Sequence, residues 1–129
     1  MSGRYLLDSN IVIAFFANEK AVVERVEHLP EVFVPVVVVG ELLYGAAKSA
    51  RWQENARRVR SFAQTVSLLA VDRTTAESYA VIKNGLREKG KPIPENDIWI
   101  AAIAREHHLT VVTRDPHFSE VDGIDVESW

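Results

Sequence analysis

The sequence predicts an α/β fold with a mostly parallel central sheet covered by helices. Short apolar runs alternate with longer helical patterns along the whole chain, which is typical of parallel strands joined by helices. The first run, Tyr5-Leu6-Leu7, is too short for a helix and stops at Asp8. The chain has 129 residues, of which 47% are hydrophobic and 26% are charged. This length and composition fit one globular domain, and we expect residues 1–129 to form it.

Six segments favour helices, and in several of them apolar residues recur at helical spacing with polar residues between them. The expected helices are residues 11–17, 20–29, 41–47, 52–64, 74–89 and 94–105. Asp8, Ser9 or Asn10 can cap the first of these helices, and Thr74 or Thr75 can cap the fifth. The second helix ends at a proline, the fifth ends at a glycine, and the sixth begins behind a proline.

Five shorter runs favour strands because they are rich in aliphatic and β-branched residues. The expected strands are residues 5–7, 32–34, 66–71, 109–113 and 124–126. Sequence alone extends the second strand through Val39, because four consecutive valines favour a buried strand over a helix. The residue between Pro35 and Gly40 at which the strand gives way to the following helix stays open.

Composition excludes several classes of protein. The chain has no cysteine, so it forms neither a disulfide framework nor a thiolate metal site. Its net charge of -3 shows no overall basicity, so any nucleic-acid binding must use a local patch. The longest apolar stretch, residues 32–40, contains a proline and is much shorter than the roughly 18 residues of a membrane span. We therefore expect a soluble cytoplasmic protein.

Glu41 lies in apolar surroundings that do not suit a carboxylate. It follows the valine run, precedes Leu42 and Leu43, and has no basic residue after it until Lys48. A carboxylate buried there without a partner would cost roughly several kcal/mol or become protonated. Glu41 therefore needs a cation.

Three aspartates supply the rest of a possible site. Asp8 and Asp115 each follow a predicted parallel strand, and Asp97 lies in the first turn of the helix that leads into the later strand. Each also has a structural explanation, as a helix cap, a residue favoured by the helix dipole or a turn residue. If they converge with Glu41, two charges about 4 Å apart repel by about 4 kcal/mol at an effective dielectric near 20. Oxygen ligands of this kind favour Mg²⁺ or Mn²⁺ over zinc.

Four stretches of the sequence resemble, in order and spacing, the motifs of the PIN-domain ribonucleases. They are Leu7-Asp8-Ser9-Asn10, Glu41-Leu42-Leu43-Tyr44-Gly45, Asn96-Asp97-Ile98-Trp99-Ile100-Ala101-Ala102 and Thr113-Arg114-Asp115-Pro116-His117-Phe118. Within that family the chain is most similar to the VapC-type toxins of toxin–antitoxin pairs, over its whole length. Ser9 stands where threonine is more usual, which keeps the hydroxyl group.

The resemblance implies a PIN-like three-layer sandwich and a Mg²⁺-dependent endoribonuclease in which Mn²⁺ can substitute. The implied metal ligands are Asp8, Glu41, Asp97 and Asp115. Asn10 and Thr113 match positions that orient ligands or water through hydrogen bonds. The family also implies a VapB-like antitoxin, a homodimer, and a helix that carries Glu41 and begins within the valine run.

The expected reaction is hydrolysis of RNA phosphodiester bonds by a metal-activated water, which leaves a 5′ phosphate. Phosphate contacts must come from local cations, for which the first candidates are Lys83, Arg87, Lys89, Lys91 and Arg114. Of these we select Arg87, Lys91 and Arg114. A solvated helix face is the alternative explanation for these charges. We interpret His117 as a surface turn residue that could touch substrate.

Two other functions fit parts of the sequence. One is a PIN-type nuclease that works in RNA processing without an antitoxin. The other is a phospho-acceptor receiver domain, which would need an acceptor aspartate near mid-chain and a lysine at the end of a late strand. Asp72 is the only such aspartate, and the late strand ends at Thr113-Arg114-Asp115 instead.

Overall fold

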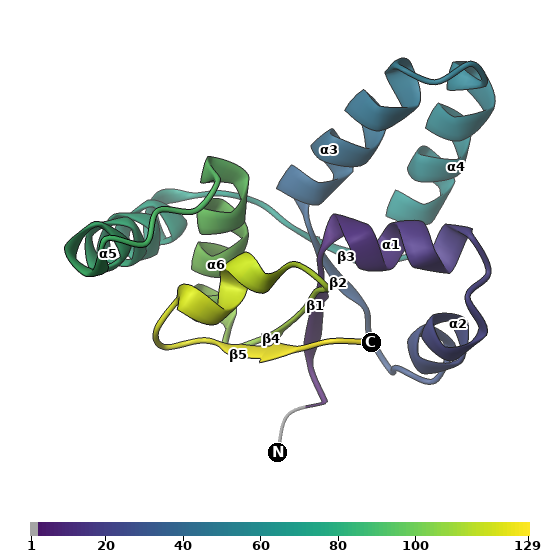
Figure 1. Ribbon diagram of the computed structural model, residues 1–129. Coiled ribbons are helices and arrows are strands. Elements are labelled where there is room, and N and C mark those ends of the chain that lie inside the picture. The colour runs from purple at the N-terminus through teal and green to yellow at the C-terminus, as the bar shows by residue number, and fades with distance from the viewer. Residues whose placement is uncertain (1–2) are drawn as a thin grey trace.

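The computed structural model of the protein describes residues 3–129 and shows the expected α/β fold (Figure 1). Its strands are β1 (Tyr5–Leu7), β2 (Phe33–Pro35), β3 (Ser67–Leu69), β4 (Thr110–Val112) and β5 (Asp125–Glu127). Its α-helices are α1 (Ser9–Phe16), α2 (Lys20–Glu27), α3 (Val36–Ala47), α4 (Trp52–Ala63), α5 (Arg73–Lys89) and α6 (Glu95–His107). A 3₁₀ helix, η1 (Pro116–Glu120), lies between β4 and β5.

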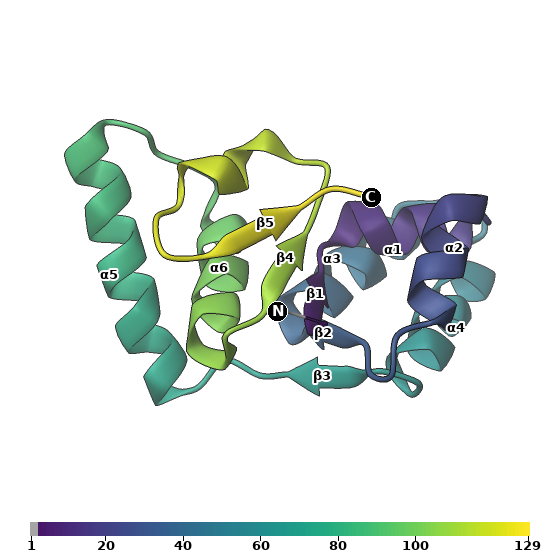
Figure 2. The same cartoon turned by 90° about the horizontal axis from the view of Figure 1, so that it is seen from below.

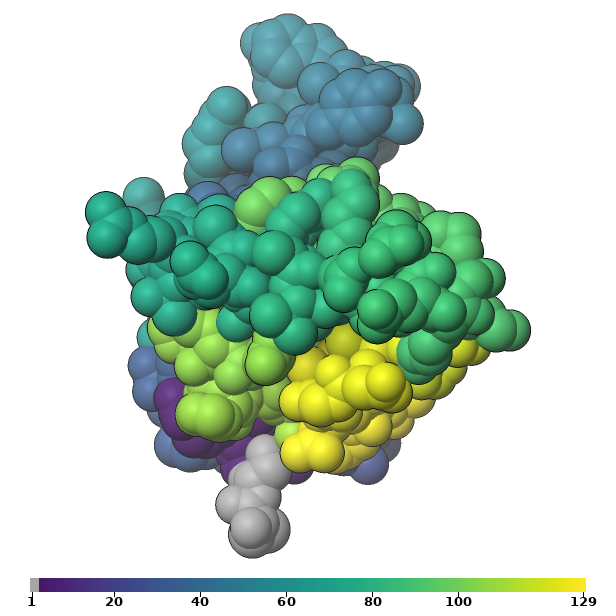
Figure 3. Space-filling view, turned by 90° about the vertical axis from the view of Figure 1, so that its left-hand side faces the viewer, coloured from purple at the N-terminus to yellow at the C-terminus, as the bar shows by residue number. Residues whose placement is uncertain are grey.

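The helices form layers on the two sides of the sheet. In Figures 1 and 2, α5 and α6 lie on one side, and α1, α2 and α4 lie on the other. Helices α3 and α4 pack against each other as a hairpin that projects from the sheet. Figure 3 shows this hairpin standing out beyond α5, which covers the nearer side of the molecule. None of the helices within residues 3–129 is both long enough and apolar enough to cross a bilayer.

The order of the strands places a ligand site between β1 and β4. The order is β3-β2-β1-β4-β5, and each neighbouring pair is parallel. The chain therefore runs outward from β1 to one edge and then returns to the other side of β1 at β4. Open α/β sheets bind ligands at the carboxyl ends of strands where the order reverses in this way. Receiver domains have the order β2-β1-β3-β4-β5, so the topology argues against that alternative.

The core packs the central strands against helices on both faces of the sheet, with α6 on one face and α1, α2 and α4 on the other. Leu6 and Leu7 of β1 and Val111 and Val112 of β4 are fully buried, and so is the middle of α6. Burial of each large side chain contributes about 1.5–3 kcal/mol. Leu7 pairs with Val112, and the amide of Asp8 donates to the carbonyl of Val112 at 3.0 Å. This ladder fixes where each of the two strands ends.

The valine run differs from the sequence-based prediction. Strand β2 ends at Pro35 and α3 begins at Val36, so the predicted strand through Val39 is wrong. Val38, Leu42 and Ala46 are buried at helical spacing, whereas Val36 is 43% exposed. The helix is favoured because it buries these three apolar side chains along one face. The family resemblance implied that this helix begins within the valine run, as it does.

The first turn of α5 also differs from its expected form. Asp72, rather than either threonine, is the N-cap, and its carboxylate accepts from the Thr75 amide at 3.1 Å. The Thr75 hydroxyl bonds the Asp72 amide in return, so the two residues form a capping box. Asp72 therefore caps a helix that follows an edge strand. This structural role explains the one aspartate that could have served as the acceptor of a receiver domain.

Candidate active site

Asp8 follows β1 directly and caps α1. Its Oδ1 accepts from the Ser9 amide at 2.8 Å, and its Oδ2 accepts from the Thr113 hydroxyl at 2.8 Å. Asp8 is only 3% exposed. Burial raises the pKa of the Asp8 carboxyl, the bonds from Thr113 and Ser9 oppose this rise, and the charge of Asp115 adds to it. Asp8 is thus held in one orientation by hydrogen bonds, and neither of these two donors carries a positive charge.

Asp97 enters the site from the first turn of α6. The helix begins behind Pro94, whose carbonyl accepts from the Asp97 amide at 3.1 Å. Asp97 is 7% exposed, and the pKa of its carboxyl is raised to about 6. Burial is the largest cause of this rise, the charges of Asp8 and Asp115 contribute to it, and a hydrogen bond from His117 opposes it. The three aspartates therefore share one electrostatic environment.

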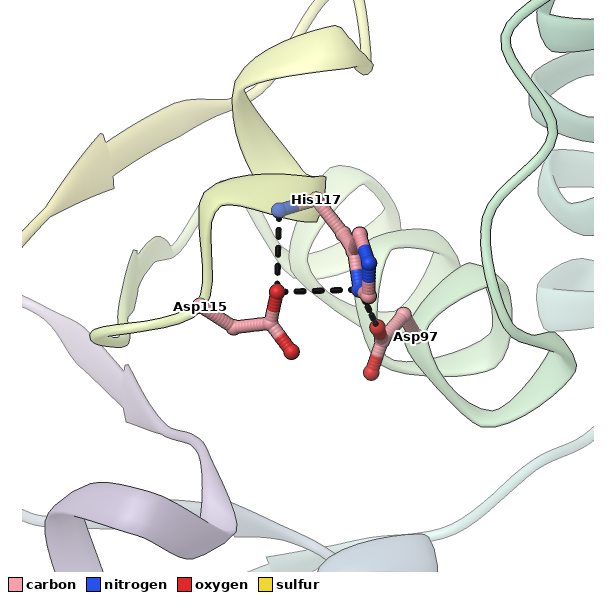
Figure 4. Close-up of side chains that lie close together, drawn as sticks. All are labelled: Asp97, Asp115 and His117. Carbon is pink, nitrogen blue, oxygen red and sulfur yellow. Dashed lines mark hydrogen bonds and ion pairs between the residues drawn. The ribbon is translucent and has the colours of Figure 1, made fainter.

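Asp115 and His117 lie at the start of η1, and Figure 4 shows them facing Asp97. Oδ1 of Asp115 caps η1 by accepting from the His117 amide at 2.9 Å. The ring atom Nδ1 of His117 lies 2.9 Å from Oδ1 of Asp115 and 3.1 Å from Oδ2 of Asp97. His117 is exposed, as expected of a turn residue, but one edge of its ring contacts both acids.

Glu41 reaches the same site from α3. Its Oε2 accepts from Nδ2 of Asn96 at 3.2 Å, whereas Oε1 is buried and finds no hydrogen-bond partner among residues 3–129. Burial raises the pKa of Glu41, the bond from Asn96 lowers it, the charge of Asp8 raises it, and the nearby Ser9 hydroxyl lowers it. An unpaired buried carboxylate oxygen is costly, so this atom indicates a missing positive partner.

Asn10 and Thr113 connect the loop after β1 with the loop after β4. Nδ2 of Asn10 donates to Oδ2 of Asp8 and to the Thr113 hydroxyl, each at 3.3 Å, and Oδ1 accepts from the Arg114 amide at 3.0 Å. The Thr113 hydroxyl also accepts from the Asp115 amide at 3.0 Å. These bonds place the carboxylates of Asp8 and Asp115 relative to each other, as a positioning role would require.

The four carboxylates come from four parts of the chain and suit a hard divalent cation. The charge of Asp8 raises the pKa of both Glu41 and Asp97, so these groups lie close enough to repel. Repulsion of this kind, together with the unpaired oxygen of Glu41, is relieved by a cation bound through oxygen atoms. The residues present therefore fit a Mg²⁺ or Mn²⁺ site.

The three cations predicted to contact RNA have different surroundings. Arg114 forms a two-point ion pair with Glu19, at 2.7 and 3.2 Å, and its Nε donates to the carbonyl of Trp129. Arg87 donates to the side chain of Asn84 on the same helix, and Lys91 is exposed after α5. All three lie on the surface, and their contact with RNA stays a prediction.

Sequence reasoning missed two members of the site. Asn96 was recognised only as part of a motif, and its bond to Glu41 joins residues that are 55 positions apart. His117 was placed on the surface without its contacts to the acids. The one available signal was its position two residues after Asp115 in a turn, where a side chain can fold back over the cap.

Comparison with known proteins identifies the family. The family model described as the PIN domain matches residues 5–124. The chain belongs to the PIN-domain family. Among curated PIN-domain relatives, Ribonuclease VapC2 of Haemophilus influenzae is 33% identical over 129 residues, and the alignment covers 98% of each chain. The tRNA(fMet)-specific endonuclease VapC of Shigella flexneri is 30% identical over 129 residues, with the same coverage. The resemblance to VapC proteins found in the sequence is thereby confirmed.

Solved PIN-domain structures agree with the fold. The chain superimposes on VapBC from Salmonella typhimurium bound to DNA with a TM-score of 0.92 and 30% identity, covering 100% of this chain and 99% of that chain. It matches VapBC-1 from nontypeable Haemophilus influenzae with a TM-score of 0.86 and 28% identity, covering 97% of both chains. The expected PIN-like architecture is confirmed.

Proposed function

We propose that this chain is a VapC-type endoribonuclease that hydrolyses RNA phosphodiester bonds with Mg²⁺ or Mn²⁺, as the toxin of a toxin–antitoxin pair. Residues 1–129 act as one PIN domain in this proposal. The observation that carries it is the unpaired, buried Oε1 of Glu41 beside three aspartates of which two are buried. That arrangement is unfavourable for folding alone and becomes favourable with a divalent cation.

Asp8, Glu41, Asp97 and Asp115 would hold the ion. When bound, it lowers the pKa of a water molecule and stabilises the charge that develops on the phosphate. One of these carboxylates accepts the proton of the attacking water. Asn10 and Thr113 hold Asp8 in place, so that the acids need not reorganise during the reaction.

RNA reaches an acidic site only if nearby cations offset its phosphates. Arg87 and Lys91 supply such charges in our proposal, and Arg114 does so where RNA competes with Glu19 for its guanidinium. The Shigella flexneri relative is a tRNA(fMet)-specific endonuclease, so tRNA(fMet) is the first substrate to assay.

An antitoxin would bind next to the acids. A hollow of about 320 Å³ between α1, α3 and α4 is lined mainly by apolar side chains, has Asn55 and Arg58 on its α4 side, and reaches Ser9 and Glu41. An apolar antitoxin segment fits this hollow, and an arginine on it would compete with the cation for the carboxylates. The VapBC structures named above support a VapB-like partner. We also propose that the toxin is a homodimer and acts in the cytoplasm.

Cleavage of structured RNA by the purified protein tests this function. We expect cleavage with Mg²⁺ or Mn²⁺ and none in EDTA, and products with a 5′ phosphate. Asp97→Asn and Asp8→Asn should each lower the rate by more than about 100-fold, because loss of an outer-shell partner alone costs about 10–100-fold. Circular dichroism should show that both variants keep the fold. Undiminished cleavage in EDTA would contradict the metal mechanism.

The antitoxin is tested separately. A small neighbouring open reading frame should encode a DNA-binding protein that co-purifies with this chain and inhibits cleavage. A metal-dependent nuclease without such a partner would instead support an RNA-processing PIN enzyme.

A further inference from the structure

A ring nitrogen of His117 lies beside the carboxylates, and a metal site formed by the four acids alone gives this nitrogen no role. Pro116 begins η1 and Asp115 caps it, so the His117 amide is bound to Oδ1 of Asp115 at 2.9 Å. This turn directs the side chain back over the carboxylates (Figure 4). Nδ1 lies between Asp115 and Asp97, while 45% of the side chain remains exposed.

The positions of these atoms suit one metal ion. Nδ1 lies 2.9 Å from Oδ1 of Asp115 and 3.1 Å from Oδ2 of Asp97. One ligand atom from each of the three residues lies within 4.8 Å of the other two. In an octahedron with bonds of about 2.1 Å, neighbouring ligands lie about 3.0 Å apart and opposite ligands about 4.2 Å apart. All three side chains can therefore ligate the same ion after only small movements.

Asp8 has less capacity to ligate than the other acids. A carboxylate offers about four lone-pair positions, and Asp8 already accepts bonds from the Ser9 amide, the Thr113 hydroxyl and Asn10. Within residues 3–129, the side chain of Asp97 is hydrogen-bonded to His117 alone. The ligands nearest to an entering ion are thus Asp97, Asp115 and the nitrogen of His117.

We propose that Nδ1 of His117 is a direct ligand of the divalent ion and makes the site prefer Mn²⁺ to Mg²⁺. The proposal rests on the proposed function, in which the acids hold an ion, and adds a nitrogen ligand to that site. Imidazole suits transition metals, whereas Mg²⁺ prefers oxygen and keeps several waters. In the ligated form Nδ1 gives its lone pair to the ion, and the ring proton resides on Nε2.

Pulsed electron paramagnetic resonance of the Mn²⁺-loaded protein tests this directly, because it detects nitrogen bound to manganese without an activity assay. The wild-type protein should show nitrogen modulation. His117→Gln should remove it, while His28→Gln, at the exposed histidine that forms the C-cap of α2, should keep it. In calorimetric titrations, His117→Gln should weaken Mn²⁺ binding by roughly tenfold or more and change Mg²⁺ binding less.

The outcomes separate this proposal from the proposed function. Mn²⁺ that binds to the wild-type protein without nitrogen modulation, and that is lost in Asp97→Asn, would overturn the His117 ligand and leave the acidic site intact. Equal weakening of Mn²⁺ and Mg²⁺ binding in His117→Gln would overturn the preference for manganese. A wild-type protein that binds neither ion would overturn both proposals.

Discussion

The two ends of the unit formed by β1, β4 and α6 have opposite chemistry. At one end, Leu6, Val111 and Ile103 are fully buried among apolar neighbours. At the other end, the same elements present Asp8 and Asp97, which are buried with raised pKa values. The change occurs within one or two residues along each element. The apolar end therefore supplies the packing that holds the acidic side chains together.

Ile103→Ala tests the apolar end and should have the largest effect on stability. Its side chain is fully buried in α6, so the change should lower the free energy of unfolding by about 2–5 kcal/mol. Ile13→Ala is the matched control, because Ile13 is 56% exposed and should change the free energy by no more than about 0.5 kcal/mol. Urea denaturation measures both. Equal effects would contradict the assignment of the core.

Asp97→Asn tests the acidic end and should stabilise the metal-free protein. The pKa of Asp97 is about 6 in the folded state, against a usual value of 3.8. The folded state therefore binds this proton more tightly than the unfolded chain does. The stability that this tighter proton binding gives to the folded state is fully present below pH 3.8 and is lost as the pH rises through about 6.

Above that range, the variant should be more stable than the wild type by at most about 3 kcal/mol. Denaturation of metal-free protein at several pH values measures the difference, with the exposed Asp125→Asn as control. Added Mn²⁺ should reverse the order of stability, because the wild type binds the ion more tightly. A variant that is less stable than the metal-free wild type at neutral pH would show that Asp97 is not under electrostatic strain.

Thr113→Val tests the connection between the two loops and should have an intermediate effect. The change removes the hydroxyl that bonds Asp8, Asn10 and the Asp115 amide. This loss should lower the free energy of unfolding by about 1–3 kcal/mol. Cleavage should fall by about 10–100-fold, because the acids lose their relative placement. Thr113→Ser keeps the hydroxyl and should retain most of the activity. Loss of activity in the serine variant would exclude a role for the hydrogen bonds.

Glu19→Gln should have the smallest effect. It weakens the pair with Arg114, which precedes Asp115, but both side chains are more than a third exposed. Solvent and salt screen such pairs, and Arg114 becomes free to bind RNA, so cleavage should rise by less than about tenfold and mainly at low salt. Glu24→Gln, on the second helix, is the control. A loss as large as that of Asp97→Asn would place Glu19 within the site itself.

The ends of the strands could be predicted from sequence because the signal is local. An apolar run that stops at an acid is visible at Asp8 and again before Asp115, and parallel strands bring such ends to one edge. The valine run could not be assigned in this way, since a short buried strand and a buried helix share the same composition. Pro35 marks the boundary, but only tertiary packing shows which side of it is helical.

Contacts between distant residues could not be predicted. The pair of Arg114 with Glu19 joins residues 95 positions apart, and the bond of Asn96 to Glu41 joins two helices, α6 and α3, that no sequence pattern relates. The rotation of the His117 ring toward the acids depends on the geometry of η1, which has no periodic signal. The identities of the acids were predictable, whereas the groups that orient them were not.

A crystal of the protein soaked in Mn²⁺ provides the most direct measurement, because anomalous scattering locates the ion without reference to activity. The peak should lie within bonding distance, about 2.0–2.3 Å, of carboxylate oxygens of Asp97 and Asp115, with Asp8 and Glu41 facing it. A well-ordered, accessible site that remains free of manganese, or an ion bound elsewhere, would contradict the convergence of these acids on one divalent cation.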